Sequence, residues 1–246
     1  MKTFKMKSMQ AAIVAGLGAL GVSGAANAVH VNPDGLGQVL IFPYYTARAG
    51  QVTSVSLINT GSTYKAVKVR FLEGKNSREV LDFNLFLSPQ DVWTGAVVAT
   101  TDGARVVSND NSCVTPSDLF TEARTDPNGL ALNAFKNYQY TGTNLDAAAF
   151  SSLDRTREGY FEVIEMGVVT TAALQGFIKH GTNGVPANCP ALDAFDPGAL
   201  VAPASGFFSN TNHLTIPTGG LAGRAPEALA GEGRDLRVRR PDHGGD

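Results

Sequence analysis

The side chains best suited to acid–base chemistry are the four histidines of this 246-residue chain. His30 and His243 lie near the two ends, so only His180 and His213 fall in stretches that are expected to fold. A serine or cysteine nucleophile needs an imidazole within hydrogen-bond reach, and nothing in the spacing places one there. The sequence also lacks Gly-x-Ser-x-Gly, His-Glu-x-x-His and Walker motifs. We therefore predict no catalytic residue and no enzyme, with a secreted hydrolase built on His180 or His213 as the alternative.

Acidic residues near position 110 offer a second kind of chemistry. Asp102, Asp110 and Asp118 stand near asparagines and provide the hard oxygen ligands that Ca²⁺ prefers. Their spacing does not match that of a twelve-residue calcium loop. We predict solvated turn residues and no metal site, and leave a calcium ion near Asp102–Asp118 as the open alternative.

Three glutamates could include the carboxylate pair of a glycosidase. They are Glu158, Glu162 and Glu165, and no second acid can be placed opposite them from the sequence. We therefore interpret them as surface charges. The one Gly-x-Gly-x-x-Gly match spans residues 16–21 and follows no predicted strand, so no cofactor is predicted either.

Aromatic side chains suggest a binding surface. Exposed aromatic rings give a large contact area at low entropy cost, which suits sugar rings or partner proteins. Phe42 and Trp93 are expected in the core, whereas Tyr44 and Tyr45 follow Pro43 at the end of a predicted strand. We predict that Tyr44 and Tyr45 are exposed and form a binding surface.

The chain contains two cysteines, Cys113 and Cys189. In an oxidising compartment two such residues are expected to pair, and no short chelating motif surrounds either of them. We predict a disulfide between Cys113 and Cys189, with free thiols as the alternative. On the chain-entropy model, closing a loop of this length would stabilise the fold by roughly 4.5 kcal/mol.

The first residues indicate the compartment. Three lysines give a positive start, an apolar run extends from Ala11 to Val22, and Ala26 and Ala28 are the small residues that a signal-peptidase site accepts. The apolar run is shorter than the roughly 20 residues that span a bilayer. We predict a secretory signal peptide over residues 1–28 and export by the Sec route. The mature chain then has no transmembrane anchor and is at the cell surface, secreted or periplasmic.

The composition excludes several classes of protein. Charged residues make up 17% and apolar residues 43% of the chain, whereas an average globular chain carries about 25% charge. Charge-driven disorder and coiled coil are therefore excluded. The formal net charge is −2, and it becomes −5 without residues 1–28, which hold three of the 20 basic and none of the 22 acidic residues. Because a nucleic-acid-binding chain needs a basic surface, we predict no nucleic-acid partner.

Hydrophobic alternation from Gly37 to Ala99 predicts antiparallel strands separated by short turns. The apolar residues that share a face in successive runs are Val55 and Leu57, then Val67, Val69 and Phe71, then Leu81, Phe83, Leu85 and Leu87. Because each sheet then has one apolar face that must be covered, we predict a mainly β fold with an immunoglobulin-like antiparallel β-sandwich over residues 29–219. Gly159–Val169 is predicted as a further strand, with a helix as the alternative. Residues 171–180 are predicted as a short helix and His213–Pro217 as a last short strand.

Two regions depart from this pattern. Residues 100–158, approximately, are predicted to be a partly helical insertion, with a helix entrance at Thr115–Asp118 and weaker helical patterns at Gly129–Tyr138 and Leu145–Leu153. Residues 220–246 are rich in Gly, Arg, Ala and Pro and are predicted to be a disordered tail. We hypothesise that this tail is an out-of-frame reading of GC-rich sequence, with a genuine flexible tail as the alternative.

Three stretches carry a resemblance to a known group. They are GQVLIFPYYTARAGQVTSVSLINTGSTYKAVKVRFLEGKNSREVLDFNLFLSPQDVWTGAVV at 37–98, REGYFEVIEMG at 157–167 and HGTNGVPANC at 180–189. Over about residues 30–221 the chain resembles uncharacterised Sec-exported cell-surface proteins of Gram-negative bacteria. The resemblance implies a location and no activity. Members are typically longer, which implies that this chain is a truncated or frameshifted member.

Together these patterns predict an exported cell-surface or periplasmic β-sandwich protein with a binding or structural role. The expected partners are cell-envelope proteins or glycans, and a carbohydrate-binding protein or secreted hydrolase is the alternative. A binding module predicts an exposed patch at Tyr44 and Tyr45. A structural module predicts a long unpaired edge strand, and a hydrolase predicts His180 or His213 beside an acid in one pocket.

Overall fold

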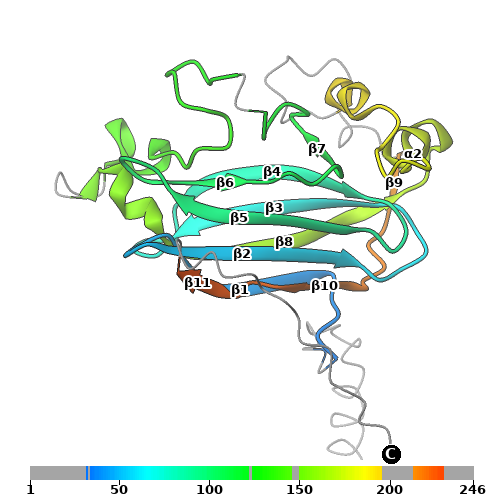
Figure 1. Ribbon diagram of the computed structural model, residues 1–246, viewed down its shortest axis with the longest axis horizontal. Coiled ribbons are helices and arrows are strands. Elements are labelled where there is room, and N and C mark those ends of the chain that lie inside the picture. The colour runs from blue at the N-terminus through cyan, green and yellow to red at the C-terminus, as the bar shows by residue number, and fades with distance from the viewer. Residues whose placement is uncertain (1–31, 33, 122–123, 146–149, 196–212, 230–246) are drawn as a thin grey trace, which may run out of the picture. The chain divides into compact units, whose positions relative to one another are not determined.

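The computed structural model describes residues 32, 34–121, 124–145, 150–195 and 213–229 (Figure 1). The predicted signal peptide, residues 1–28, lies outside these residues. From Gly35 onward the described chain belongs to one unit, and its strands form two antiparallel sheets. The predicted mainly β fold with two antiparallel sheets is therefore confirmed, while its immunoglobulin-like character stays a prediction.

The first sheet contains the longest strands. Its members are β1 (Val39–Thr46), β3 (Lys65–Glu73), β4 (Glu79–Leu87), β7 (Cys113–Thr115), β8 (Glu158–Val169) and β9 (Leu214–Thr215). Among the described residues the order is β1–β8–β3–β4–β7, with β9 beside β8. The predictions of a strand at Gly159–Val169 and of a short strand within His213–Pro217 are thus confirmed.

The second sheet is smaller and is completed by the C-terminal part of the described chain. Its members are β2 (Gln51–Asn59), β5 (Val92–Ala99), β6 (Ala104–Val107), β10 (Leu221–Arg224) and β11 (Glu227–Leu229). The order is β10–β2–β5–β6, and β11 also pairs with β2. In the described residues, β2 therefore receives two successive strands along one side.

The main core lies between the two sheets and contains the side chains that the alternation placed inside. Its fully buried members from the predicted runs are Val55 and Leu57 of β2, Val67, Val69 and Phe71 of β3, and Phe83, Leu85 and Leu87 of β4. Trp93 is also buried, and Gly95 makes room for it, because a Cβ at Gly95 would lie 2.6 Å from the indole ring. Burial of so many large apolar side chains is the main stabilising contribution to the sandwich.

A second core covers one end of the first sheet on its outer face. Helix α2 (Ala172–Ile178), within the predicted helix 171–180, and the 3-10 helix η5 (Cys189–Ala194) pack there with Phe86 and Val169. Cys113 and Cys189 form the predicted disulfide, with a Cα–Cα distance of 5.1 Å. The disulfide thus fixes this helical segment to the edge strand β7.

The insertion at 100–158 is less helical than predicted. Its described residues contain β6, β7 and three 3-10 helices: η1 (Tyr138–Tyr140), η2 (Gly142–Asn144) and η4 (Leu153–Arg157). No α-helix follows Thr115 up to residue 121, because Asp193 accepts hydrogen bonds from the backbone N–H and hydroxyl of Ser117, and tertiary contacts override local propensity. In Figure 1 the green loops of this insertion lie at one end of the sheets and α2 lies at the other.

The prediction that residues 220–246 form a disordered tail is wrong for residues 221–229. β10 and β11 pair with β2 over these residues, and Leu221 is buried in the main core. Backbone ladder bonds do not depend on a strand's own side-chain composition, and Gly223 lets Phe42 approach, since a Cβ there would lie 2.7 Å from the Phe42 ring. Residues 230–246 lie outside the described residues, and the sandwich extends beyond the predicted end at residue 219 at least to residue 229.

A short strap, residues 217–220, connects the two sheets between β9 and β10. Gly219 and Gly220 have φ of +78° and +79°, a left-handed conformation that glycine adopts without a steric cost. This turn directs the N–H groups of Thr218 and Gly219 at the buried carboxylate of Glu165, 3.0 and 2.7 Å away. The strap is therefore fastened to the interior of the sandwich.

Candidate functional site

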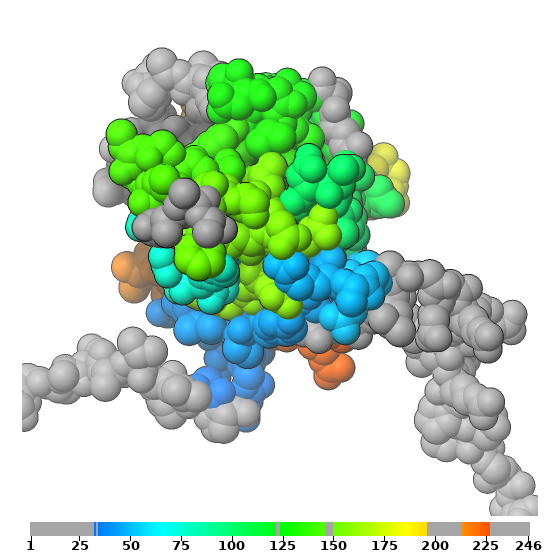
Figure 2. Space-filling view, turned by 90° about the vertical axis from the view of Figure 1, so that its left-hand side faces the viewer, coloured from blue at the N-terminus to red at the C-terminus, as the bar shows by residue number. Residues whose placement is uncertain are grey.

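The exposed tyrosine lies in a groove at the insertion end of the sandwich. Its lining residues, which define the Tyr44 groove, are Pro43, Tyr44, Arg48, Gly74, Lys75, Arg155, Glu158, Gly159 and Tyr160. The groove has a volume of about 360 Å³. Figure 2 looks onto this end, where blue, cyan and yellow-green segments, which are far apart in the sequence, lie side by side on the surface.

Charged side chains that contact one another surround Tyr44, and Glu158 is the central member of this charged frame. Its carboxylate accepts a hydrogen bond of 3.2 Å from the Tyr44 hydroxyl and lies 3.0 Å from Nε of Arg48. Arg48 also binds Asp154, with 3.0 Å between Nη1 and Oδ2. By bridging two carboxylates, Arg48 links side chains of β8 and η4, and Glu158 connects them to Tyr44 of β1.

A buried ion pair between Arg155 and Glu73 fixes the turn between β3 and β4 on its interior side. Arg155 donates from Nε and Nη2 to the two carboxylate oxygens of Glu73, at 2.6 and 2.9 Å. The backbone N–H groups of Lys75, Asn76 and Arg78 donate to the same carboxylate. Burial acts to raise the pKa of Glu73, but the hydrogen bonds from Arg155 and these N–H groups outweigh it and lower the pKa to about 2. The turn is therefore rigidly placed.

Lys75 presents its ammonium group at the side of the groove. Nζ lies 3.6 Å from the centre of the Phe150 ring, a cation–π contact of modest strength at an exposed site. Among the described residues, no carboxylate lies within ion-pair distance of this ammonium. Three cationic side chains line the Tyr44 groove: Arg48, Lys75 and Arg155. Of these, Lys75 is the one that has no acidic partner among the described residues.

Of the two predicted surface tyrosines, only Tyr44 is exposed. Tyr44 is 43% exposed, whereas Tyr45 is fully buried, so the prediction of an exposed pair is wrong for Tyr45. Its ring packs edge-on against Phe71 and Phe135, and its hydroxyl donates to the Thr156 carbonyl, 3.0 Å away. Burial raises the pKa of Tyr45 well above its ordinary range. Neighbouring residues of a strand point to opposite faces, which separates the two rings.

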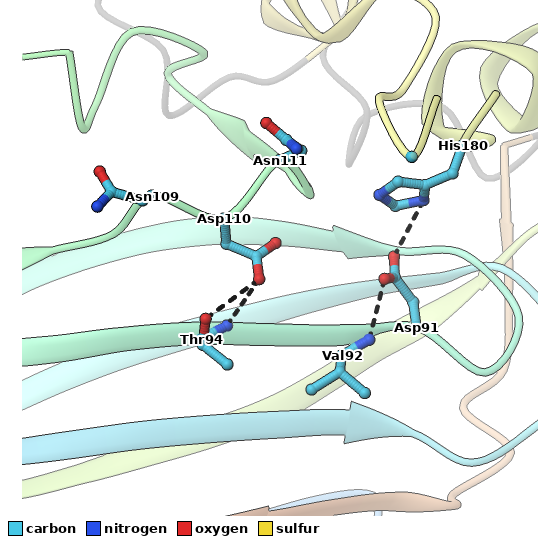
Figure 3. A pocket seen from close by; sticks show the side chains of 8 residues that line it. Asp91, Val92, Thr94, Asn109, Asp110, Asn111 and His180 are labelled. Carbon is cyan, nitrogen blue, oxygen red and sulfur yellow. Dashed lines mark hydrogen bonds and ion pairs between the residues drawn. The ribbon is translucent and has the colours of Figure 1, made fainter. Parts of the chain in front are cut away.

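A second hollow lies at the disulfide end of the sandwich (Figure 3). Its lining residues, which define the His180 cleft, are Asp91, Val92, Thr94, Asn109, Asp110, Asn111, His180 and Gly184. Asp110 accepts hydrogen bonds from the backbone N–H and hydroxyl of Thr94 and of Ser112. These bonds use the Asp110 carboxylate to fasten the loop after β6 to β5.

The His180 cleft brings a histidine, an acid and a serine together. His180 Nδ1 lies 3.6 Å from Oδ2 of Asp91 and 3.1 Å from Oγ of Ser88. Ser88 itself donates to Asp91 from its backbone N–H and its hydroxyl. In a nucleophilic triad the acid and the serine contact different imidazole nitrogens, whereas here both contact Nδ1. The arrangement holds the β4–β5 turn and differs from that of an activated nucleophile.

The other sequence candidates have structural partners. His213 contacts the Thr171 hydroxyl through Nδ1 at 2.7 Å and the edge of Phe195. Within the described ranges no three His, Cys, Asp or Glu side chains are grouped closely enough to hold a metal ion, so the structure does not bring Asp102, Asp110 and Asp118 together.

The three glutamates of β8 have separate environments. Glu158 belongs to the Tyr44 groove, and Glu162 pairs with Arg70. Glu165 is fully buried beside Lys65, so the interpretation of all three as surface charges is wrong for Glu165. The pairing with a lysine one hundred residues away explains the burial, because a buried carboxylate needs an opposite charge.

Sequence reasoning missed most of the residues that surround Tyr44. Arg48, Lys75 and Glu158 come from three separate segments, and only the strand register brings them together: Thr46 pairs with Glu158, and Glu73 pairs with Gly159. Alternation predicts which face a residue occupies but not its partner on the next strand. A weak signal was present, since Lys75 lies between the predicted strand runs that end at Phe71 and begin at Leu81, and Arg48 follows the tyrosines closely.

Comparisons of the chain with family models, with curated proteins and with solved structures find no match. Over the described ranges, no helix has the length and hydrophobicity needed to cross a membrane. The assignment of a role therefore depends on the two hollows themselves. The Tyr44 groove combines an exposed ring with an ammonium that lacks an acidic partner, whereas the carboxylates of the His180 cleft are used to hold loops.

Proposed function

We propose that this chain is an exported binding module of the bacterial cell envelope and that the Tyr44 groove binds a glycan. The observation that carries the proposal is the 43% exposed ring of Tyr44 in a groove whose charged frame is fixed by hydrogen bonds. The Cys113–Cys189 disulfide supports a location outside the cytosol. Sec export and a cell-surface or periplasmic location are part of the proposal.

The chemistry of the Tyr44 groove fits sugars. Aromatic rings such as Tyr44 and Tyr160 provide flat apolar faces for sugar rings, and the Glu158 carboxylate can accept hydrogen bonds from hydroxyl groups. Because the Glu73–Arg155 pair fixes the β3–β4 turn before a ligand arrives, little side-chain and loop entropy is lost on binding.

A structural or filament-forming role is the second candidate, and the edge strand β1 argues against it. Val39 and Ile41 are 50% and 66% exposed on this edge, which would suit strand addition. However, Pro43 interrupts the edge, and the register with β8 shifts between Phe42 and Tyr45. Proline and bulges are the devices that keep edge strands from pairing with other chains.

A hydrolase role receives less support than binding. The His180 cleft does bring His180 and Asp91 together, as that alternative predicts, but Ser88 and Asp91 contact the same ring nitrogen. Ser88 is buried and is not among the residues that line the cleft. A nucleophile must reach both its base and its substrate.

The proposal is tested by screening the purified protein against immobilised oligosaccharides from bacterial envelopes. We expect specific binding that Tyr44→Ala weakens by about tenfold or more, as for a buried aromatic anchor. Tyr138→Ala is the matched control, because Tyr138 is 40% exposed and does not line the groove. Absence of glycan binding, or equal loss in both variants, would overturn the proposal.

A further inference from the structure

We infer that the glycan in the Tyr44 groove carries a carboxylate and that Lys75 is the residue that selects it. This inference rests on the proposed function and names the ligand class. The ligand we expect is a uronate-type acidic sugar, with its ring against Tyr44 and its carboxylate at Nζ of Lys75.

The charges around the groove single out Lys75. Arg48 is neutralised by Asp154 and Glu158, at 3.0 Å each. Arg155 is buried and paired with Glu73. The Lys75 ammonium contacts only the face of the Phe150 ring among its described neighbours, so it is the cation that can bind an anion without breaking an existing ion pair.

The position of Lys75 is set by its backbone. Its N–H donates to Glu73 at 2.7 Å, and the N–H of Gly74 donates to the Glu158 carbonyl at 3.0 Å. These bonds hold the turn against the start of β8, beside Tyr160. A flexible lysine side chain on a fixed turn keeps its ammonium within reach of the groove, and a charge-assisted hydrogen bond to a carboxylate is stronger than a neutral one.

Glu158 limits how much negative charge a ligand can bring. Its side chain is 42% exposed and lies in the same groove as Lys75. A like charge close to an anionic ligand is unfavourable, so a ligand with one carboxylate and several hydroxyl groups fits better than a phosphate dianion. The hydroxyl groups would donate to Glu158 while the carboxylate contacts Lys75.

The experiment compares one acidic oligosaccharide with its own reduced form. A glucuronate-containing oligosaccharide and the same molecule with each carboxylate reduced to the alcohol differ only in the group that Lys75 would contact. We expect the protein to bind the acidic form about tenfold more tightly, which corresponds to one good charge-assisted contact. The preference should fall with added salt, since the site is exposed.

Variants separate this inference from the proposed function. Lys75→Gln should weaken binding of the acidic form about tenfold and so remove the preference, and Lys75→Arg should retain it. Lys179→Gln is the matched control, because Lys179 is exposed and does not line the Tyr44 groove. Equal binding of both forms by the unmodified protein, with loss in Tyr44→Ala, would overturn the inference and leave the proposed function. Binding of neither form, together with a negative envelope screen, would overturn both, and tighter binding of a phosphorylated analogue would overturn the carboxylate assignment.

Discussion

Lys65 and Glu165 form an ion pair of 2.6 Å inside the sandwich, with side chains only 1% and 0% exposed. Glu165 also accepts hydrogen bonds from the backbone N–H groups of Thr218 and Gly219, and Lys65 donates to the Thr218 hydroxyl at 2.9 Å. The strap thus completes the hydrogen bonding of both charges. A buried charge without such partners is strongly destabilising.

We therefore expect Lys65→Met to lower the free energy of unfolding by about 3–5 kcal/mol, because it leaves Glu165 buried without an opposite charge. The double variant Lys65→Met/Glu165→Leu should recover most of that loss, since both charges are then absent. Urea unfolding of the two variants provides the measurement. A single variant within about 1 kcal/mol of the unmodified protein would contradict the assigned role.

Removal of the chain after Pro217 should be far more damaging than removal after Leu229. The first truncation deletes β10 and β11 and leaves one side of β2 unpaired, and it removes the N–H donors of Glu165. We expect aggregation or loss of the cooperative unfolding transition, because an exposed edge is a template for association. The composition of residues 230–246 predicts no contribution to a core, so the second truncation should keep the melting temperature within about 2 °C. Equal behaviour of the two would show that β10 and β11 contribute little.

The free energy of unfolding should depend on pH through the ionisation of the Glu73 carboxylate. Its pKa is lowered from 4.5 to about 2, so the folded state favours the ionised carboxylate. This contribution is complete above the unfolded pKa of about 4.3 and is lost as the pH falls through 2. The difference in unfolding free energy between the unmodified protein and Glu73→Gln should shrink by roughly 3 kcal/mol between pH 6 and pH 2. A difference independent of pH would refute the assigned pKa direction.

Truncation of the side chain should destabilise the fold far more at Tyr45 than at its neighbour Tyr44. Tyr45→Ala removes a fully buried ring and should cost about 3–5 kcal/mol. Tyr45→Phe removes only the hydrogen bond to Thr156 and should cost about 1 kcal/mol. Tyr44→Ala changes an exposed side chain and should cost about 0.5 kcal/mol. Thermal unfolding of the three variants measures the order, and a large loss in Tyr44→Ala would place that ring in the core.

Loss of the disulfide should loosen the helical segment first. Cys113→Ser/Cys189→Ser should lower stability by about 2–4 kcal/mol. The second core around Phe86 depends on α2 and η5 staying in place, so amide hydrogen exchange should increase there before it increases in β3 and β8. Uniform protection across the chain in the double variant would show that the disulfide is dispensable for this segment.

Alternation was sufficient to predict the sheets. The runs ending at Phe71 and Leu87 each bury the face that was expected, because a period of two follows directly from strand geometry. The disulfide followed from cysteine count and compartment. The fold class was therefore available from the sequence before any contact was known.

Contacts between side chains of distant segments could not be predicted from the sequence in this way. Lys65 and Glu165, and Tyr44 and Glu158, are brought together by strand register, and no local pattern encodes which strand lies beside which. Likewise, the composition of residues 221–229 predicted disorder, but their backbone groups pair with β2. A sequence window cannot report a hydrogen-bond partner that lies outside it.

The pairing of β10 and β11 with β2 also determines when the second sheet can be completed during folding. In chain order β2 comes early, whereas β10 and β11 come after the whole insertion and both cysteines. Until β10 and β11 are in place, one side of β2 has no partner strand, and the Glu165 carboxylate lacks the N–H donors of Thr218 and Gly219.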